Sequence, residues 1–122
     1  MKIASVTPQL RTTDLAGSIR FYTETLGFQL AFQYQDFYAG VCAGSYVVHL
    51  KLVDEPDPAI DWVRKAEHVD LYLEVDDVRS AAAELEAKDV RLTRGVHETP
   101  WRTREITLED DQGHSLYLYE NL

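Results

Sequence analysis

Side chains that could do chemistry recur at alternate positions of three strand-like segments. His49 and Asp70 carry acid–base chemistry, and an imidazole near a carboxylate can act as a general base, bind a metal or hydrogen-bond a ligand. Residue types alone leave these alternatives open. The other polar or aromatic side chains on the same faces include Lys51, Tyr72 and Tyr117.

Those faces are polar because each strand-like segment alternates. In segment 68–75, Leu71 and Leu73 are apolar and Tyr72 lies between them; in segment 114–120, Leu116 and Leu118 flank Tyr117. Alternation of this kind predicts a sheet with one face on a core and one face free for water or a ligand. Tyrosines on several strands favour a ligand groove on the free face.

A helical segment that runs directly into a strand positions the first of these faces. In residues 13–28, Asp14 is a helix cap, Gly27 is a helix end, and Phe28 starts a strand. The apolar stripe of the predicted helix consists of Leu15, Ile19, Tyr22 and Leu26. A weaker copy of the pattern starts at Asp77, which indicates a duplication.

The duplication predicts an α+β protein of two βαβββ modules that form a curved mixed sheet with a groove. One domain, 1–122, would contain modules at about 1–54 and 68–122, joined by a linker at 54–67 whose first stretch, with Pro56 and Pro58, is extended. The predicted elements are strand 3–11, the helix after Asp14, strands 28–34, 37–42, 46–53 and 68–75, helix 78–88, strand 90–94, a loop through Pro100, and strands 104–109 and 114–120.

Composition limits the function classes. The net charge of −9 argues against nucleic acid and modestly favours neutral or cationic small ligands. With no long apolar run and no leader sequence, we expect no membrane partner and a cytoplasmic location. The single cysteine, Cys42, excludes an internal disulfide, and we expect it to be a packing residue.

The two modules resemble the vicinal oxygen chelate superfamily, which includes glyoxalase I, dioxygenases and bleomycin-resistance proteins. Three stretches carry the resemblance: residues 13–28, the EVDDV sequence at Glu74–Val78, and EDDQGHSLYLYE at Glu109–Glu120. The resemblance spans nearly the whole chain. It implies the fold and says little about the activity.

The resemblance also implies where family enzymes would hold a divalent metal. The four positions are Thr7, His49, Asp70 and Tyr117. Only His49 and Asp70 are good ligands, and two protein ligands rarely hold a metal tightly. We therefore expect no metal and no other cofactor, with vestigial positions at these four residues; a divalent metal held by a variant set is the alternative.

The details are closest to the bleomycin-resistance branch. They are Pro8 in the first strand, the segment 35–41, and the Thr99-Pro100-Trp101 loop. That branch is non-catalytic and sequesters an antibiotic in the grooves of a homodimer, so the resemblance implies a binding protein for an aromatic ligand, a cationic one included. The alternative is a metal-dependent lyase, isomerase or oxygenase of the glyoxalase or dioxygenase type.

In the binding interpretation, no residue is catalytic and aromatic rings clamp the ligand. The expected ligand-binding residues are Phe32, Tyr34, Phe37, Tyr38, His49, Lys51, Asp70, Tyr72, Trp101 and Tyr117. His49 could bind the ligand or pair with Asp70 across the groove. Trp101 could be a stacking lid, a packing plug or a dimer contact, and Trp62 has the same alternatives.

Overall fold

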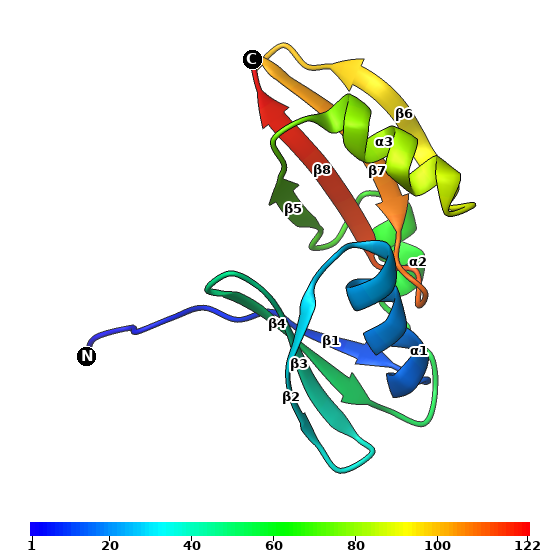
Figure 1. Cartoon of the computed structure of the whole chain (residues 1–122). Helices are drawn as coiled ribbons and strands as arrows, with labels where there is room; N and C mark the ends of the chain where they lie inside the picture. Colours follow the sequence, from blue (N-terminus) through cyan, green and yellow to red (C-terminus); the bar gives the residue numbers. More distant parts are fainter. The chain divides into compact units, whose positions relative to one another are not determined.

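Each half of the chain forms a four-stranded mixed sheet with a helix on one face (Figure 1). The computed structural model describes residues 1–122, which divide into two units, Met1–Pro58 and Ala59–Leu122. The boundary falls inside the predicted linker. The predicted α+β class and the two βαβββ modules are confirmed, with a separate sheet in each module; the groove stays a prediction.

The first unit has strand order β1-β4-β3-β2. Strand β1 pairs with β4 in parallel, and the other pairs are antiparallel, so β1 and β2 run in the same direction at opposite edges. The connection between them must cross one face, where helix α1 packs on β3 and β4. The elements are β1 (Gln9–Thr12), α1 (Leu15–Arg20), η1 (Phe21–Thr25), β2 (Gln29–Tyr34), β3 (Tyr38–Ala43) and β4 (Tyr46–Leu52).

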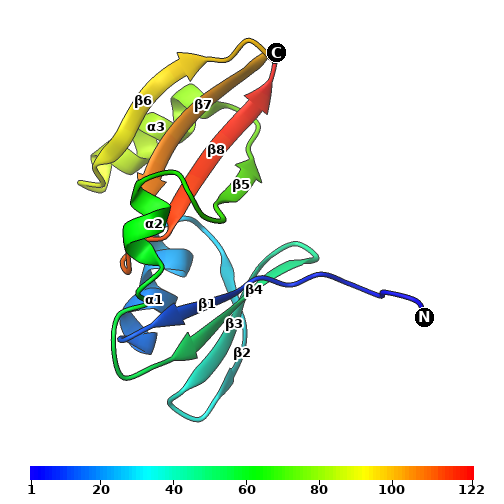
Figure 2. The same cartoon turned by 180° about the vertical axis from the view of Figure 1, so that it is seen from behind.

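The second unit repeats this topology with strand order β5-β8-β7-β6. Helix α3 packs on β6, β7 and β8, and Figure 2 shows this sheet from the side opposite to the helix. The elements are α2 (Ile60–Arg64), β5 (Leu71–Glu74), α3 (Val78–Ala87), β6 (Leu92–Glu98), β7 (Thr103–Glu109) and β8 (Ser115–Asn121). The duplication read from the sequence is therefore a duplication of topology.

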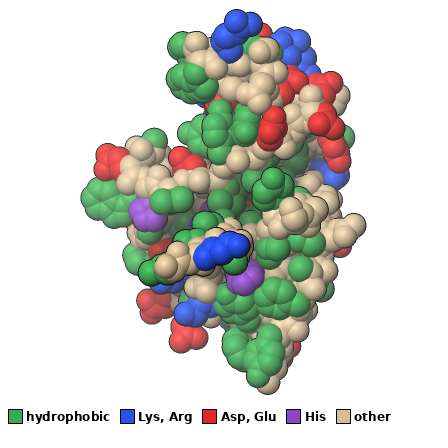
Figure 3. All heavy atoms as spheres, turned by 90° about the vertical axis from the view of Figure 1, so that its left-hand side faces the viewer, with side chains coloured by type: hydrophobic (Ala, Val, Ile, Leu, Met, Phe, Trp, Pro, Cys, Tyr) green, Lys and Arg blue, Asp and Glu red, His purple; other side chains and the backbone are tan.

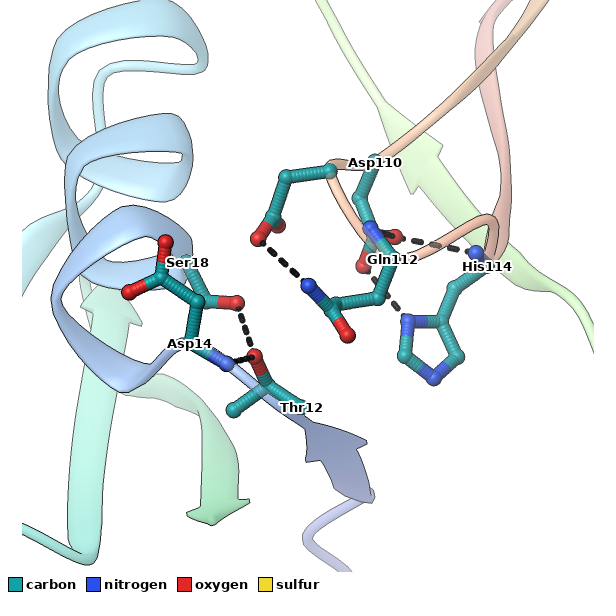
Figure 4. A network of polar contacts seen from close by, with 7 residues as sticks. Thr12, Asp14, Ser18, Asp110, Gln112 and His114 are labelled. Atoms are coloured by element: carbon teal, nitrogen blue, oxygen red, sulfur yellow. Dashed lines mark hydrogen bonds and ion pairs between the residues drawn. The ribbon is translucent and has the colours of Figure 1, made fainter. Parts of the chain in front are cut away.

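An aspartate caps each long helix, as the sequence predicts. Asp14 Oδ1 accepts a hydrogen bond from the Gly17 N–H at 3.0 Å, and Asp77 Oδ1 accepts one from the Ser80 N–H at 3.1 Å. These bonds satisfy backbone donors that a helix start leaves unpaired. In the first unit, the Asp14 N–H and the Ser18 hydroxyl also donate to Thr12 Oγ1, which joins β1 to α1 (Figure 4).

The first helix does not keep one regular period. A π-helical turn, η1, follows α1, with the Leu26 N–H donating to the Phe21 carbonyl at 3.2 Å. Tyr22 is fully buried and packs edge-to-face against Phe21 and Phe28. Gly27 then ends the helix with a φ of +80°, which glycine adopts without steric cost.

Three predicted segments differ from the structure. The predicted linker contains a helix that the sequence did not predict, α2 at Ile60–Arg64, in which Ile60 and Val63 are buried. Strand β1 begins at Gln9 and β5 at Leu71, so both are shorter than predicted. Strand β6 continues to Glu98 through part of the predicted loop, since irregular pairing with β7 carries it past Gly95.

The cores lie between each helix and its sheet. Full burial of a valine, leucine or isoleucine side chain contributes about 1.5–3 kcal/mol to stability. The buried apolar residues are Leu15, Tyr22, Ala39, Val41, Val48 and Leu50 in the first unit, and Ile60, Val63, Val78, Ala82, Leu85, Ile106, Leu108, Leu116 and Leu118 in the second. None of the helices has the length and hydropathy needed to cross a membrane.

The turn before β8 depends on a glycine. Gly113 has a φ of +93°, and a Cβ there would lie 2.9 Å from Ile60 Cγ2. We expect Gly113→Ala to lower the free energy of unfolding by about 1–3 kcal/mol, because left-handed backbone strain and crowding add together. Urea unfolding measures the difference.

Gly95→Ala is the matched control. A Cβ at Gly95 meets no atom within 4 Å, so its stability should stay close to that of the parent chain. Equal unfolding midpoints for the two variants would contradict the assigned role of Gly113.

Candidate functional site

The polar face of the first sheet brings together one side chain from each strand. Gln9 of β1 donates from Nε2 to the Tyr38 hydroxyl of β3 at 2.8 Å, and Tyr38 Oη lies 2.9 Å from His49 Nδ1 of β4. The ring of Phe32 of β2 meets His49 edge-to-face at 5.2 Å and lies nearly parallel to Tyr38 at 6.2 Å. We call these four residues the aromatic cluster.

A bulge in β2 turns Phe32 toward this face. Leu30 pairs with Val41 and Phe32 pairs with Gly40, so Ala31 is an extra residue on β2. Without the bulge, Leu30 and Phe32 would point to the same side. Gly40 is needed as well, because a Cβ there would lie 2.3 Å from Phe32 Cε1.

Other predicted residues extend the surface around the aromatic cluster. Tyr34 pairs with Tyr38, and its ring contacts Phe37 edge-to-face at 5.5 Å. Lys51 pairs with Tyr38 from the other side and is exposed. Phe32 is 40% exposed, Tyr34 58% and Phe37 46%, so flat ring surfaces face solvent. Figure 3 shows hydrophobic side chains beside histidine side chains on the surface turned toward the viewer.

The polar face of the second sheet carries a tyrosine group beside a buried carboxylate. Tyr72 pairs with Tyr117, with ring centroids 5.7 Å apart, and lies 4.1 Å from the Tyr119 ring. The Tyr72 hydroxyl donates to Glu105 Oε1. The structure thus brings together two of the predicted ligand residues, Tyr72 and Tyr117.

Glu105 is only 3% exposed and is held by hydroxyl groups. Thr103 Oγ1 donates to Glu105 Oε1 at 2.8 Å, and His97 Nε2 lies 3.9 Å from Glu105 Oε2. Burial raises the pKa of the Glu105 carboxyl, because the charged form loses its hydration. We call Tyr72, His97, Thr103 and Glu105 the Glu105 cluster.

Sequence reasoning missed His97 and Thr103. The predicted strand ended at Arg94, so His97 fell in a loop and its pairing with Glu105 was hidden. Extending the strand to Glu98 would have placed His97 opposite Glu105, and starting the next strand at Thr103 would have placed Thr103 on the same face as Glu105. Gln9 was missed because its importance comes from a hydrogen bond and not from its residue type.

Asp70 lies just before β5 and has both an unpaired buried oxygen and polar neighbours. Its Oδ1 is buried without a hydrogen-bond partner. Burial raises the pKa of this carboxyl, and a hydrogen bond with Ser115 and the charge of His68 oppose the shift. Asp70 has Ser115 and His49 has Tyr38 as partners within their own units, and pairing between His49 and Asp70 stays a prediction.

Trp101 lies in the turn between β6 and β7 and is 67% exposed. It makes no ring contact with another aromatic residue of its unit. Trp62 of α2 is 52% exposed and has Lys65 Nζ 5.0 Å from its ring centroid. A stacking role for Trp101 or Trp62 stays a prediction.

The residues at the four positions of the family's metal do not fit a divalent ion. Thr7 precedes β1 and is exposed, and the β1 residue opposite His49 is the amide Gln9. Tyr72, a phenol, is the residue opposite Tyr117. Within either unit, no group of three or more His, Cys, Asp or Glu side chains comes close enough to hold a metal ion. Zinc sites in proteins have at least three such ligands.

The sequence of residues 2–118 matches the family model described as the Glyoxalase/Bleomycin resistance protein/Dioxygenase superfamily. No curated protein matches the chain. This family is the one that the sequence motifs resemble, so the resemblance is confirmed.

Solved structures share the fold. A superfamily member from Sphaerobacter thermophilus is 23% identical with a TM-score of 0.76, and 98% of each chain is covered. A bleomycin-binding protein from Streptomyces verticillus, complexed with copper(II)-bleomycin, is 23% identical with a TM-score of 0.69 (97% of this chain, 96% of that one). A lactoylglutathione lyase from Agrobacterium tumefaciens is 16% identical with a TM-score of 0.73 (98% and 96%).

The raised pKa of Glu105 predicts a pH-dependent stability. Its folded pKa lies above its unfolded pKa, so the folded state binds more protons between the two values and stability falls as pH rises through that window. Glu105→Gln keeps the acceptor for Tyr72 and Thr103 and removes the charge. We expect this variant to gain stability over the parent chain as the pH rises from about 4 to about 8, measured by thermal unfolding.

Glu84→Gln supplies the control, since Glu84 is an exposed carboxylate on α3. Its stability relative to the parent chain should change little with pH. A Glu105→Gln variant that loses stability at the higher pH would show that the carboxylate is needed in its charged form.

Proposed function

Because the chain belongs to the glyoxalase/bleomycin resistance protein/dioxygenase superfamily, we propose that it binds and sequesters an aromatic small molecule without transforming it. The observation that carries this proposal is the aromatic cluster. Its three rings, those of Phe32, Tyr38 and His49, come from three different strands, and Phe32 leaves 40% of its surface exposed. Rigid rings that stay partly exposed suit stacking against a flat ligand.

The cluster is held in place before any ligand arrives. Gly40 leaves room for Phe32, while Gln9 and His49 restrain Tyr38 from either side. Side chains that already occupy their binding geometry lose little conformational entropy on association. Tyr34, Phe37 and Lys51 would enlarge the contact around this centre.

Charge narrows the ligand class. The net charge of −9 attracts cations, and aromatic faces interact favourably with cationic groups. The second sheet offers a comparable surface of its own, with the rings of Tyr72 and Tyr117 and the carboxylate of Asp70. An aromatic antibiotic or a related natural product with a basic group meets these requirements.

Two proteins of the same fold have different activities. The Streptomyces verticillus protein binds copper(II)-bleomycin, in agreement with the binding proposal. The Agrobacterium tumefaciens protein is a lactoylglutathione lyase. The donor set around His49 and Tyr117 favours the first activity for this chain, because amide and phenol groups stand where metal ligands are required.

Assembly into a homodimer is part of the proposal. Strand β2 is an edge strand whose six residues are all exposed, and it carries Leu30, Phe32 and Tyr34. An exposed edge with apolar side chains favours pairing with another chain. Sedimentation equilibrium should give twice the mass of one chain, and a single-chain mass at micromolar concentration would contradict the dimer.

The binding surface can be tested with acridine orange, a planar cation, and with copper(II)-bleomycin. We expect at least one of them to bind in isothermal titration calorimetry. Phe32→Ala should then weaken binding roughly 2- to 12-fold, because an aromatic pair contributes about 0.5–1.5 kcal/mol. A screen of neutral and cationic planar compounds by thermal shift extends the test if neither probe binds.

Tyr46→Ala is the matched control. Tyr46 is 80% exposed, lies on the same unit and alternates to the face opposite His49. Equal losses for Tyr46→Ala and Phe32→Ala would refute the assignment of the face. Stoichiometric metal that is lost in His49→Ala, together with conversion of a glutathione hemithioacetal, would replace the proposal with the lyase activity.

A further inference from the structure

We infer that Gln9 and Tyr38 keep the ring proton of His49 on Nε2, where it can be donated. The aromatic cluster then selects a planar ligand that carries a hydrogen-bond acceptor at its edge. The ligand preference rests on the proposed function. The donor assignment of His49 concerns the free protein and does not depend on a ligand. Ring nitrogens with a lone pair and carbonyl oxygens are acceptors of the required kind.

The direction of the hydrogen bonds follows from Gln9. Its Nε2 can only donate, so it uses a lone pair of Tyr38 Oη at 2.8 Å. The phenol has a single hydrogen, and the one acceptor of the first unit within its reach is His49 Nδ1 at 2.9 Å. Tyr38 therefore donates to Nδ1, which carries the lone pair.

The tautomer of the neutral imidazole is then determined. When Nδ1 accepts a hydrogen bond, the ring proton must be on Nε2. No side chain of the first unit takes that proton: Phe32 packs its ring edge-to-face with His49 at 5.2 Å and offers no acceptor nitrogen or oxygen. The Nε2–H group is therefore available to a ligand that lies on the exposed part of the cluster.

The same arrangement works against metal binding at His49. A histidine ligates through an unprotonated nitrogen, and the lone pair is already used by Tyr38 on the Nδ1 side. Freeing the Nε2 lone pair would require His49 Nδ1–H to donate to Tyr38, which reverses the hydrogen bond between these two residues. The phenol hydrogen would then lose its acceptor in the first unit unless Gln9 turned its carbonyl toward Tyr38.

Gln9→Glu should reverse the direction of the two hydrogen bonds that join residue 9, Tyr38 and His49. A carboxylate only accepts, so Tyr38 would donate to Glu and accept from His49 Nδ1–H, which leaves a lone pair on Nε2. Nitrogen-15 NMR of labelled histidine at about pH 8.5, where an ordinary imidazole is neutral, distinguishes protonated from unprotonated ring nitrogens. We expect protonated Nε2 in the parent protein and protonated Nδ1 in Gln9→Glu.

Gln29→Glu adds the same charge on β2, away from the hydrogen bonds that join Gln9, Tyr38 and His49, and should keep the parent tautomer. Tyr38→Phe removes the link and should give a mixture of both tautomers. A protonated Nδ1 in the neutral parent protein, or the same tautomer in Gln9→Glu, would overturn the donor assignment without any ligand being involved.

Quinoline, which has a ring-nitrogen acceptor, and indole, which has an N–H donor, test the ligand preference. The parent protein and Gln29→Glu should bind quinoline about tenfold more tightly than indole, and Gln9→Glu should reverse the order. Equal affinities in all variants with a reversed tautomer would overturn the ligand preference. Binding of neither would count against the proposed function, while the NMR result still decides the donor assignment.

Discussion

The parallel pairing of the first and last strands of each module determines which side chains meet. Since β1 and β2 run the same way at opposite edges, the chain between them must cross one face of the sheet, and α1 covers that face. The other face is then free along all four strands. The register of the parallel pair places Gln9 beside His49, and its counterpart in the second unit places Tyr72 beside Tyr117. Both candidate surfaces follow from this one constraint.

Duplicated topology does not give duplicated chemistry. On the first sheet, the bulge at Ala31 and the missing side chain at Gly40 leave an aromatic surface with exposed rings. On the second sheet, the central group is Glu105, which is 3% exposed and closed in by Tyr72 and Thr103. In the proposed function, a ligand on the second sheet would meet the tyrosine rings first, and Glu105 would act on it through the Tyr72 hydroxyl that it orients.

Much of the fold could be predicted because local signals and topology agree. Asp14 and Asp77 cap the helices that the sequence indicates, and Gly27 ends the first of them with a positive φ. The site was harder to predict. Strand alternation placed His49, Tyr72 and Tyr117 on the polar faces, but it could not reveal His97, whose place depends on irregular pairing between β6 and β7. Helix α2 was missed because neighbouring prolines masked a short apolar spacing.

The direction of a hydrogen bond cannot be read from residue types alone. His49 could be read from the sequence as a base, a metal ligand or a donor, and every alternative uses the same ring. Gln9 separates them, because an amide nitrogen that donates to Tyr38 leaves the phenol hydrogen for Nδ1. Had a carboxylate stood at position 9, the same three strands in the same register would present a lone pair at Nε2, ready for a metal or a ligand donor. In the proposed function, the specificity of this face would thus be set by Gln9, a residue at its edge that need not touch the ligand.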